Sequence, residues 1–185
     1  MKRIICLLFA TLILSGCSGK AEELNRAMQL RADWLAKKMC FDAEITADYG
    51  DVQYTFAVSC EADTAGNMTF TVKKPDTIAG ITGSISATGG KLTFDDTALA
   101  FDLMADGQLT PVSAPWVLVK TLRSGYLSSC AMEGEDLRLA IDDSYEEDAL
   151  HLEIWIGVDN VPKLAEIYWQ GRRLLTVKVS NFVVS

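Results

Sequence analysis

The sequence is poor in the residues from which active sites and metal centres are most often built, because it contains a single histidine, His151. With no second histidine or cysteine at ligand spacing, neither a zinc site nor a Ser–His–Asp triad can be assembled from it. His151 alternates with Leu150 and Leu152, which predicts that it faces away from the apolar side of a strand. We therefore expect a surface histidine, no enzymatic activity, no bound metal and no cofactor.

Basic residues and long apolar runs are scarce as well. The chain has 17 Lys and Arg against 25 Asp and Glu, a formal net charge of −8. This balance argues against nucleic acid and against electrostatic docking on anionic lipid, because the long-range field repels both. No apolar run reaches the roughly 20 residues of a transmembrane helix. Repeats and Pro/Gly/Ser-rich linkers are also lacking, so one domain is expected after the N-terminus.

The first seventeen residues carry the most specific signal in the chain. Lys2 and Arg3 precede an apolar run over 4–14, and Leu14-Ser15-Gly16-Cys17 closes it. A basic start, a short apolar run and small residues before a cleavage point are typical of a secretory signal peptide. Leu-Ser-Gly-Cys resembles the lipobox of bacterial lipoproteins, in which the cysteine is acylated and becomes the new N-terminus. We predict a signal peptide over 1–16 and lipidation at Cys17.

The lipobox resemblance implies a diacylglyceryl group on Cys17 and a short lipidated tether over 17–21. Two acyl chains suffice for stable anchoring, where one is marginal. The mature protein is therefore expected at the extracytoplasmic face of a cell membrane, anchored to it without spanning it. Loss of Lys2 and Arg3 leaves 15 basic against 25 acidic residues, a formal charge of −10.

Hydrophobic periodicity divides the rest of the chain into two helices and about eleven strands. Residues 21–38 place apolar side chains near helical spacing, with acidic residues early and basic residues late. We expect this helix to cover the core; the alternative is a helix that lies on the membrane. A second helix is predicted over 113–123 with Ser113 as its N-cap. The other segments alternate with period two and are joined by short links, which predicts antiparallel strands.

These elements predict one α+β domain over 22–185. Its sheet is expected to be a strongly curved antiparallel half-barrel of about eleven strands. The N-terminal helix and the mid-chain helix are the two elements available to cover its concave face.

Three cysteines remain for the folded part: Cys40, Cys60 and Cys130. If the segments around residues 40 and 60 form a hairpin that turns near Gly50, the numbers of facing residues sum to about 100. Cys40 would then face Cys60 at a separation close to that of a disulfide. The alternative is two reduced thiols packed as small hydrophobic side chains, as we expect for Cys130.

An acidic segment, Asp142-Asp143-Ser144-Tyr145-Glu146-Glu147-Asp148, separates two of the predicted strands. Its carboxylates suit a calcium ion, but the segment lacks the glycine and the bidentate spacing of a calcium loop. We therefore interpret it as a solvated hairpin loop whose charge keeps the neighbouring strand edges soluble.

The order of elements and a few local phrases resemble the LolA/LolB superfamily of lipoprotein carriers, which includes lipid-binding lipoproteins such as LppX. The phrases are Phe70 to Pro75, Lys91 to Asp96 leading to Leu99, Pro111 before the second helix, Pro162 with Ala165 to Ile167, and Gly171 before Val179 to Phe182. The resemblance covers nearly the whole mature chain. It departs from the soluble Gram-negative carrier in having no arginine between Arg31 and Arg123, where that carrier has one that helps close its lid.

The resemblance implies an open half-barrel whose apolar concave face holds acyl chains under a helical lid. The residues expected to line that space are inward-facing at period two or lie on the lid helix: Tyr54, Phe56, Phe70, Phe94, Phe101, Trp116, Leu152 and Ile154. The alternative is that the same residues form a dry, filled core. Two functions follow: a membrane-anchored lipoprotein that binds lipid or acyl chains, or an envelope interaction module that binds a protein partner.

Overall fold

The computed structural model describes residues 18–95, 97–105 and 108–185. The predicted signal peptide over 1–16 and the lipidation site Cys17 lie outside this part. The helical elements are α2 (Ser18–Leu35), η1 (Asp76–Ile78), η2 (Pro111–Ser113) and α3 (Ala114–Ser124). The strands are β1 (Met39–Asp48), β2 (Gln53–Ala62), β3 (Met68–Lys74), β4 (Thr82–Ser86), β5 (Gly89–Phe94), β6 (Thr97–Phe101), β7 (Met104–Ala105), β8 (Gln108–Leu109), β9 (Tyr126–Glu133), β10 (Asp136–Asp142), β11 (Leu150–Ile156), β12 (Pro162–Trp169) and β13 (Arg172–Val184).

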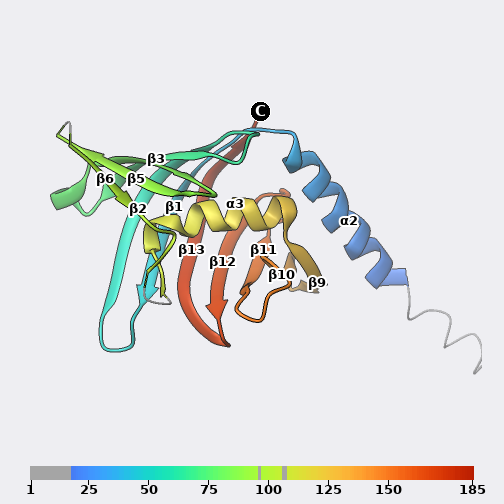
Figure 1. Ribbon diagram of the computed structural model, residues 1–185. Helices are drawn as coiled ribbons and strands as arrows, with labels where there is room; N and C mark the ends of the chain where they lie inside the picture. The colour runs from blue at the N-terminus through green and yellow to red at the C-terminus, as the bar shows by residue number, and fades with distance from the viewer. Residues whose placement is uncertain (1–17, 96, 106–107) are drawn as a thin grey trace, which may run out of the picture.

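Eleven of these strands form one antiparallel sheet in the order β6-β5-β4-β3-β2-β1-β13-β12-β11-β10-β9 (Figure 1). Strands that follow one another in sequence pair from β1 to β6 and from β9 to β13, because short links favour antiparallel neighbours. The two halves are joined where β1 pairs with β13, while β7 and β8 form a separate two-stranded sheet. The sheet is not closed, and β6 and β9 are its two edges. The predicted α+β half-barrel is confirmed.

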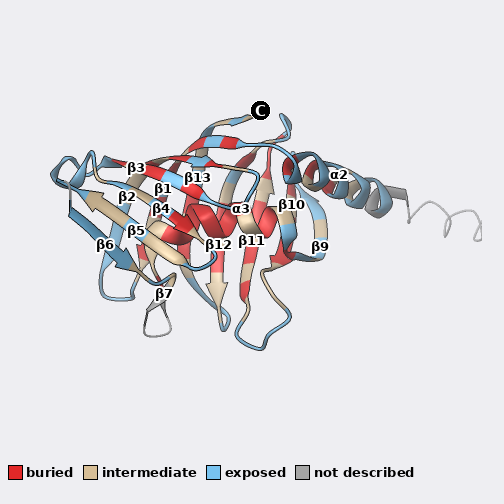
Figure 2. Cartoon of the chain, turned by 45° about the horizontal axis from the view of Figure 1, so that its top comes forward, coloured by how far each residue is buried: buried red, intermediate tan, exposed pale blue. Residues whose placement is uncertain are grey.

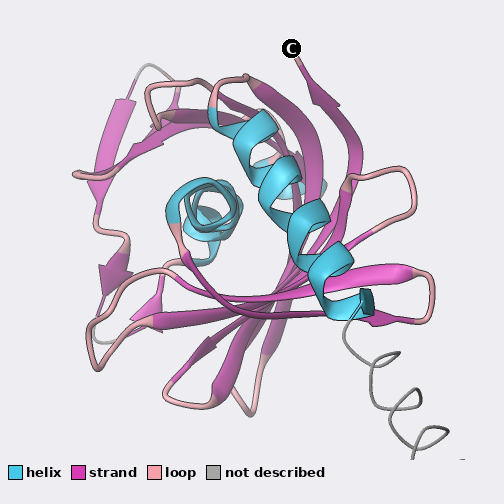
Figure 3. Cartoon of the chain, turned by 90° about the vertical axis from the view of Figure 1, so that its right-hand side faces the viewer, coloured by secondary structure: helices cyan, strands magenta, loops and turns pink. Residues whose placement is uncertain are grey.

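Helix α3 lies inside the curve of the sheet, where strands surround it on several sides when it is viewed end on (Figure 3). Its sequence is apolar around most of its circumference, so residues on opposite sides, such as Val117 and Val119, are both buried. A helix that is hydrophobic all round must be enclosed by the rest of the protein. The concave side of the sheet is therefore occupied by α3 rather than left empty beneath it.

The inner face of the sheet is packed most closely in its C-terminal half. The pairing register places Ile45, Val177, Ala165, Ile154 and Leu139 in one row across β1, β13, β12, β11 and β10. All five are completely buried. Alternation with period two sends their neighbours to the outer face, so this row and α3 form the centre of the core.

Helix α2 packs against α3 and against the edge strand β9. Ala27, Leu30 and Trp34 form its buried face. The helix begins at Ser18 and ends at Leu35, three residues earlier at each end than predicted. The tether predicted over 17–21 is thus helical from Ser18 onward, so the helix starts directly after the predicted lipidation site.

The predicted register of the β1–β2 hairpin is off by one residue. Its turn spans residues 49–52, where the Tyr49 amide donates to the Val52 carbonyl, so the numbers of facing residues sum to 101. Cys60 therefore lies opposite Phe41, and Cys40 lies opposite Glu61. The two cysteines are on opposite faces of the sheet and both are free thiols, with Cys40 exposed and Cys60 buried. The predicted Cys40–Cys60 disulfide is absent because of this shift.

Ser113 is the N-cap residue of α3, as predicted, but its side chain does not cap the helix. Ser113 has helical backbone angles and makes no side-chain capping bond, because η2 runs directly into α3. Its hydroxyl instead donates to the Thr110 carbonyl at 2.6 Å. Pro111 and Pro115 stand in the first turns of these helices, where the missing amide hydrogen costs nothing.

Candidate functional site

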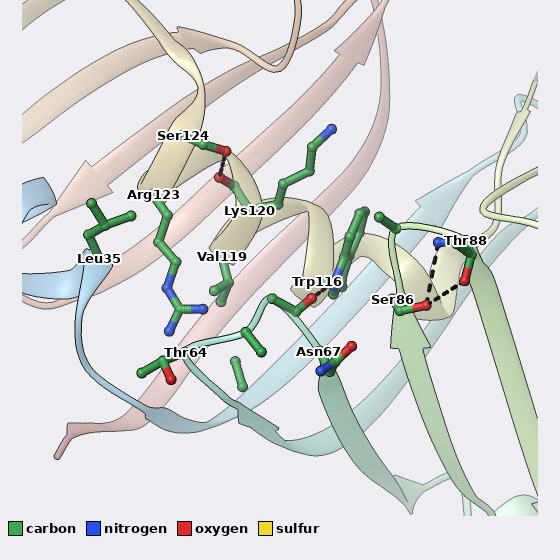
Figure 4. Close-up of a pocket in the computed structure, with 14 residues that line it drawn as sticks. Leu35, Thr64, Asn67, Ser86, Thr88, Trp116, Val119, Lys120, Arg123 and Ser124 are labelled. Carbon is green, nitrogen blue, oxygen red and sulfur yellow. Dashed lines mark hydrogen bonds between the residues drawn. The ribbon is translucent and has the colours of Figure 1, made fainter.

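A half-open groove of about 550 Å³ lies between α3 and two turns of the sheet, the β2–β3 turn and the β4–β5 turn (Figure 4). The end of α2 borders it through Leu35. Its lining combines apolar and small polar side chains: Leu35, Ala62, Thr64, Ala65, Gly66, Asn67, Ser86, Ala87, Thr88, Trp116, Val119, Lys120, Arg123 and Ser124. We call this space the rim groove, since it lies at the rim of the half-barrel rather than in its packed centre.

One face of α3 forms a wall of the rim groove. Trp116, Val119, Lys120 and Arg123 recur at intervals of three and four residues, which places them on one side of a helix. The indole of Trp116 is nearly buried and donates from Nε1 to the Gly66 carbonyl at 2.8 Å. That bond fastens α3 to the β2–β3 turn and holds the two walls of the groove at a fixed separation.

Arg123 fastens the other end of the groove. Its Nε donates to the Trp34 carbonyl at 3.2 Å, Nη1 donates to the Asp63 carbonyl at 2.6 Å, and Nη2 donates to the Lys37 carbonyl at 2.6 Å. Burial lowers the pKa of Arg123, while the Asp63 carboxylate acts in the opposite direction. The guanidinium thus joins the end of α2, the start of the β2–β3 turn and α3.

A second arginine makes the reciprocal connection. Arg31 of α2 donates from Nε to the Leu122 carbonyl at 2.8 Å and from Nη2 to the Gly125 carbonyl, at the end of α3. Helix C-termini leave carbonyls without intrahelical partners and carry a partial negative charge, so a cation there is stabilising. Each of the two helices therefore supplies an arginine to the end of the other, an arrangement that we call the arginine clamp.

Lys120 borders the rim groove and forms an ion pair with the acidic loop. Its ammonium lies 3.3 Å from Asp143 Oδ2 and 5.7 Å from the centre of the Trp116 ring. The side chain is 39% exposed and its partner is a carboxylate of the acidic loop. The Asp143 side chain is only 16% exposed and also accepts the Leu150 amide, so the ammonium of Lys120 is held at the acidic loop.

The structure separates the residues predicted to line a lipid site. Trp116 lines the rim groove, whereas Phe70, Leu152 and Ile154 are buried in the packed core. Phe56 and Phe101 are half-buried against that core, and Tyr54 and Phe94 are 58% and 62% exposed. The prediction therefore found one wall of the groove. It missed Leu35, Arg123 and the two turns, which no periodic pattern marks.

The inner face of the sheet becomes uncovered toward the β6 edge. The register places Phe70, Gly83, Leu92 and Leu99 in one row, and Phe94 follows Leu92 on the same face. Phe70 is buried, with its ring over Gly83, whereas Leu99 is 64% exposed. The apolar inner surface thus extends beyond the area that α3 covers, as the exposed colour of β6 in Figure 2 also shows.

His151 lies on the outer face of β11, on the side predicted from its alternation with Leu150 and Leu152. Its Nδ1 lies 2.7 Å from Asp142 Oδ1 and its Nε2 lies 3.3 Å from Glu153 Oε1. Within the described ranges, no group of three or more His, Cys, Asp or Glu side chains is arranged to hold a metal ion. The acidic segment is the β10–β11 hairpin loop, and its Asp143 accepts the Leu150 amide at 2.8 Å.

Comparison with known families identifies the N-terminal segment. Residues 1–18 match the family described as the prokaryotic membrane lipoprotein lipid attachment site, which confirms the predicted lipobox ending at Cys17. The chain is thus a lipoprotein by its attachment site. None of the helices in the described part is both long and apolar enough to cross a bilayer.

No curated protein matches the sequence of this chain. Solved structures similar to it include a LolA superfamily protein from Nitrosomonas europaea (TM-score 0.45, 10% identity, 90% of this chain and 93% of that one). The LppX lipoprotein of Mycobacterium tuberculosis (0.42, 10%, 87% and 93%) and the Pseudomonas aeruginosa MucA/MucB complex (0.40, 13%, 90% and 57%) are also similar. All three TM-scores are below 0.5, so these similarities carry no argument about function.

Proposed function

We propose that this lipoprotein, anchored at the extracytoplasmic face of a cell membrane, binds an acyl chain of a lipid in the rim groove. The observation that carries the proposal is a groove of about 550 Å³ with apolar side chains from α2, β2 and α3. Small-molecule sites are concave, mostly apolar and about 300–1,000 Å³ in volume, with a few polar groups that fix orientation. Here those groups are the hydroxyls of Thr64, Ser86 and Thr88 and the amide of Asn67.

The half-open form of the groove suits reversible binding. Each methylene that leaves a bilayer must recover about 0.8 kcal/mol from its new environment. A groove with a mixed lining recovers part of this energy, so a bound chain remains exchangeable with the membrane. The uncovered inner face near Leu99 and Phe94 provides further apolar surface on the same side of the sheet.

Native mass spectrometry of the acylated protein, released from membranes in a mild detergent, tests this function. We expect non-covalent lipid adducts on the wild-type protein. Ala87 is exposed and lines the groove, so an Ala87→Trp variant should fill the groove. Ala79 is exposed and lies outside the groove, so Ala79→Trp is the matched control. Adduct occupancy should fall about tenfold in the first variant, equivalent to about 1.4 kcal/mol, and stay unchanged in the second. Adducts that are missing from the wild type, or equal in both variants, contradict the proposal.

One observation favours a different function, that of an envelope interaction module that binds a protein. The concave side of the sheet is occupied by α3, so the centre of the half-barrel offers no room for a ligand. Absence of lipid adducts in the experiment above, together with a stable complex with an envelope protein, would favour this second function. No catalytic step is proposed in either case, since the imidazole of His151 is bonded to two carboxylates rather than to a nucleophile.

A further inference from the structure

Helix α2 has a second apolar face that the core does not use. Ala27, Leu30 and Trp34 are buried against the body of the protein, whereas Leu24, Met28 and Leu35 are 45%, 52% and 55% exposed. With 3.6 residues per turn, positions 24, 28 and 35 fall within about 40° of one another around the helix. They form a stripe, which we call the outer stripe, about 100° away from the buried face.

Over residues 21–35, the outer stripe belongs to a wider sector that contains no charged residue. Ala21 and Ala32 are exposed and extend it to a width of about 80°, whereas Glu22, Gln29 and Asp33 lie on the far side of the helix from Leu24. Arg31 borders the sector, but its guanidinium is turned to the carbonyls at the end of α3. An exposed apolar sector of this kind on one helix is typical of contact with a partner or a membrane.

The attachment site determines what that contact is. The lipid attachment match ends at residue 18, and Ser18 is the first residue of α2, so Cys17, the predicted acylation site, directly precedes the helix. At 1.5 Å per residue, Leu24 and Met28 lie only about 9 and 15 Å along the helix from its start. The acyl chains hold that start at the lipid surface, so the bilayer is the partner within reach of the sector.

We infer that α2 lies along the surface of the bilayer to which the protein is anchored, with Leu24, Met28 and Leu35 inserted among the lipids. An interfacial helix buries its apolar side at the boundary between headgroups and acyl chains. The formal charge of the chain without its signal peptide is −10, so the surface that suits this contact is zwitterionic rather than anionic. The covalent anchor and the outer stripe together fix the orientation of the protein on the membrane.

This orientation has a consequence for the rim groove, because Leu35 belongs to both surfaces. It is the last residue of α2 on the outer stripe, and it borders the groove. With α2 on the bilayer, the Leu35 end of the groove opens at the lipid surface, where an acyl chain can enter without crossing water. This consequence rests on the proposed function, whereas the membrane contact of α2 does not.

Spin labelling of the acylated full-length protein in phosphatidylcholine vesicles tests the contact. Cys40 and Cys130 are replaced by serine, whereas Cys60 is retained, since burial raises the pKa of its thiol and protects it from modification. A nitroxide is placed at Met28→Cys, and in a matched protein at Gln29→Cys, one residue along and outside the sector. Collision rates with oxygen, which enters lipid, and with a water-soluble nickel complex are compared at both positions.

We expect the ratio of oxygen to nickel collisions to be several-fold higher at position 28 than at position 29. Equal, water-like ratios overturn the inference. Spin–spin broadening at position 28 that disappears when unlabelled protein is added also overturns it, because it would show that a second copy covers the stripe. The ratio of oxygen to nickel collisions at position 28 should be the same when Ala87→Trp is also present. A membrane-like ratio without lipid adducts would therefore contradict only the binding of an acyl chain in the rim groove. A water-like ratio with lipid adducts would contradict only the contact of α2 with the membrane.

Discussion

His151 is held between two carboxylates on the outer face of the sheet, at the pairing position opposite Asp142. Arg138 reaches the second carboxylate, Glu153, at 3.2 Å, so the imidazole and a guanidinium share that partner. Burial alone lowers the pKa of His151, but its hydrogen bonds with Asp142 and Glu153 act in the opposite direction, and the net effect is a raised pKa. The protonated imidazole is thus the form that the folded protein favours.

A raised pKa in the folded state contributes stability while the group is protonated. The contribution is complete below the unfolded pKa of about 6.5 and is lost as pH rises through the higher folded pKa. We expect His151→Gln to destabilise the protein at pH of about 5.5 and the difference from wild type to shrink toward pH of about 8.5. The side chain is 39% exposed, so the difference should stay below about 1 kcal/mol. Urea unfolding at both pH values measures it, and a difference that does not change with pH would contradict this account.

Individual contacts were the part of the structure that sequence patterns predicted least well. Alternation placed His151 on the outer face correctly, because period two depends only on the residues of its own strand. The Cys40–Cys60 pair depended on the register of two strands, and the four-residue turn over 49–52 shifted that register by one. A shift of one residue moves a side chain to the other face, so small errors in a turn cancel a predicted contact completely.

The arginine clamp joins the C-terminal end of α2 to the C-terminal end of α3. Each arginine reaches carbonyls that the last turn of a helix leaves without partners, so the clamp satisfies polar groups as well as linking two elements. The chain has no arginine between these two positions.

Replacement of Arg123 should loosen the junction of α2, α3 and the β2–β3 turn. We expect Arg123→Gln to lower the free energy of unfolding by about 2–3 kcal/mol, since three carbonyls lose a charged donor at once. Arg172→Gln is the matched control, because Arg172 is exposed and reaches only the Asp48 carbonyl at 3.5 Å; its effect should lie within about 0.5 kcal/mol. Equal effects of the two substitutions in urea unfolding would show that the clamp does not stabilise the fold.

Both helices and nearly all strands could be predicted from periodicity, because each amphipathic element carries its own pattern. The bounds of α2 differ from the predicted bounds by three residues, since charged residues near the ends of a helix indicate its termini only approximately. The burial of α3 on two opposite sides does not follow from its periodicity alone. Trp116, Val119 and Leu122 recur at intervals of three residues, a spacing that indicates one covered face. Val117 on the opposite side is buried as well, because the curved sheet surrounds the helix.

The molecule as a whole combines a filled half and an uncovered flank. Strands β10 to β13 close around α3, while β5 and β6 extend past it with their inner apolar residues exposed. Sequence alternation identifies the inner face of a strand but not its distance from the helix that covers it. Alternation therefore predicts an inward-facing side chain at both Tyr54 and Ile154. Tyr54 is 58% exposed near the tip of a hairpin, whereas Ile154 is completely buried. This is why the candidate site could be predicted only at Trp116.

Stability and ligand binding should therefore depend on different residues. Ile154 is fully buried in the row of core residues beneath α3, and Ile154→Ala removes packing there. We expect a loss of about 2–5 kcal/mol in the free energy of unfolding, the usual cost of such a truncation. The rim groove lies outside this row, so the lipid adducts seen by native mass spectrometry should persist in the folded variant.

Ala87→Trp should behave in the opposite way. Ala87 is exposed in the β4–β5 turn, so its replacement should change the free energy of unfolding by no more than about 0.5 kcal/mol. The occupancy of the lipid adducts should nevertheless fall about tenfold. The comparison of the two variants locates the ligand. If adducts instead disappear in folded Ile154→Ala and persist in Ala87→Trp, the acyl chain enters the interior of the half-barrel, and α3 must move out of the concave side to admit it.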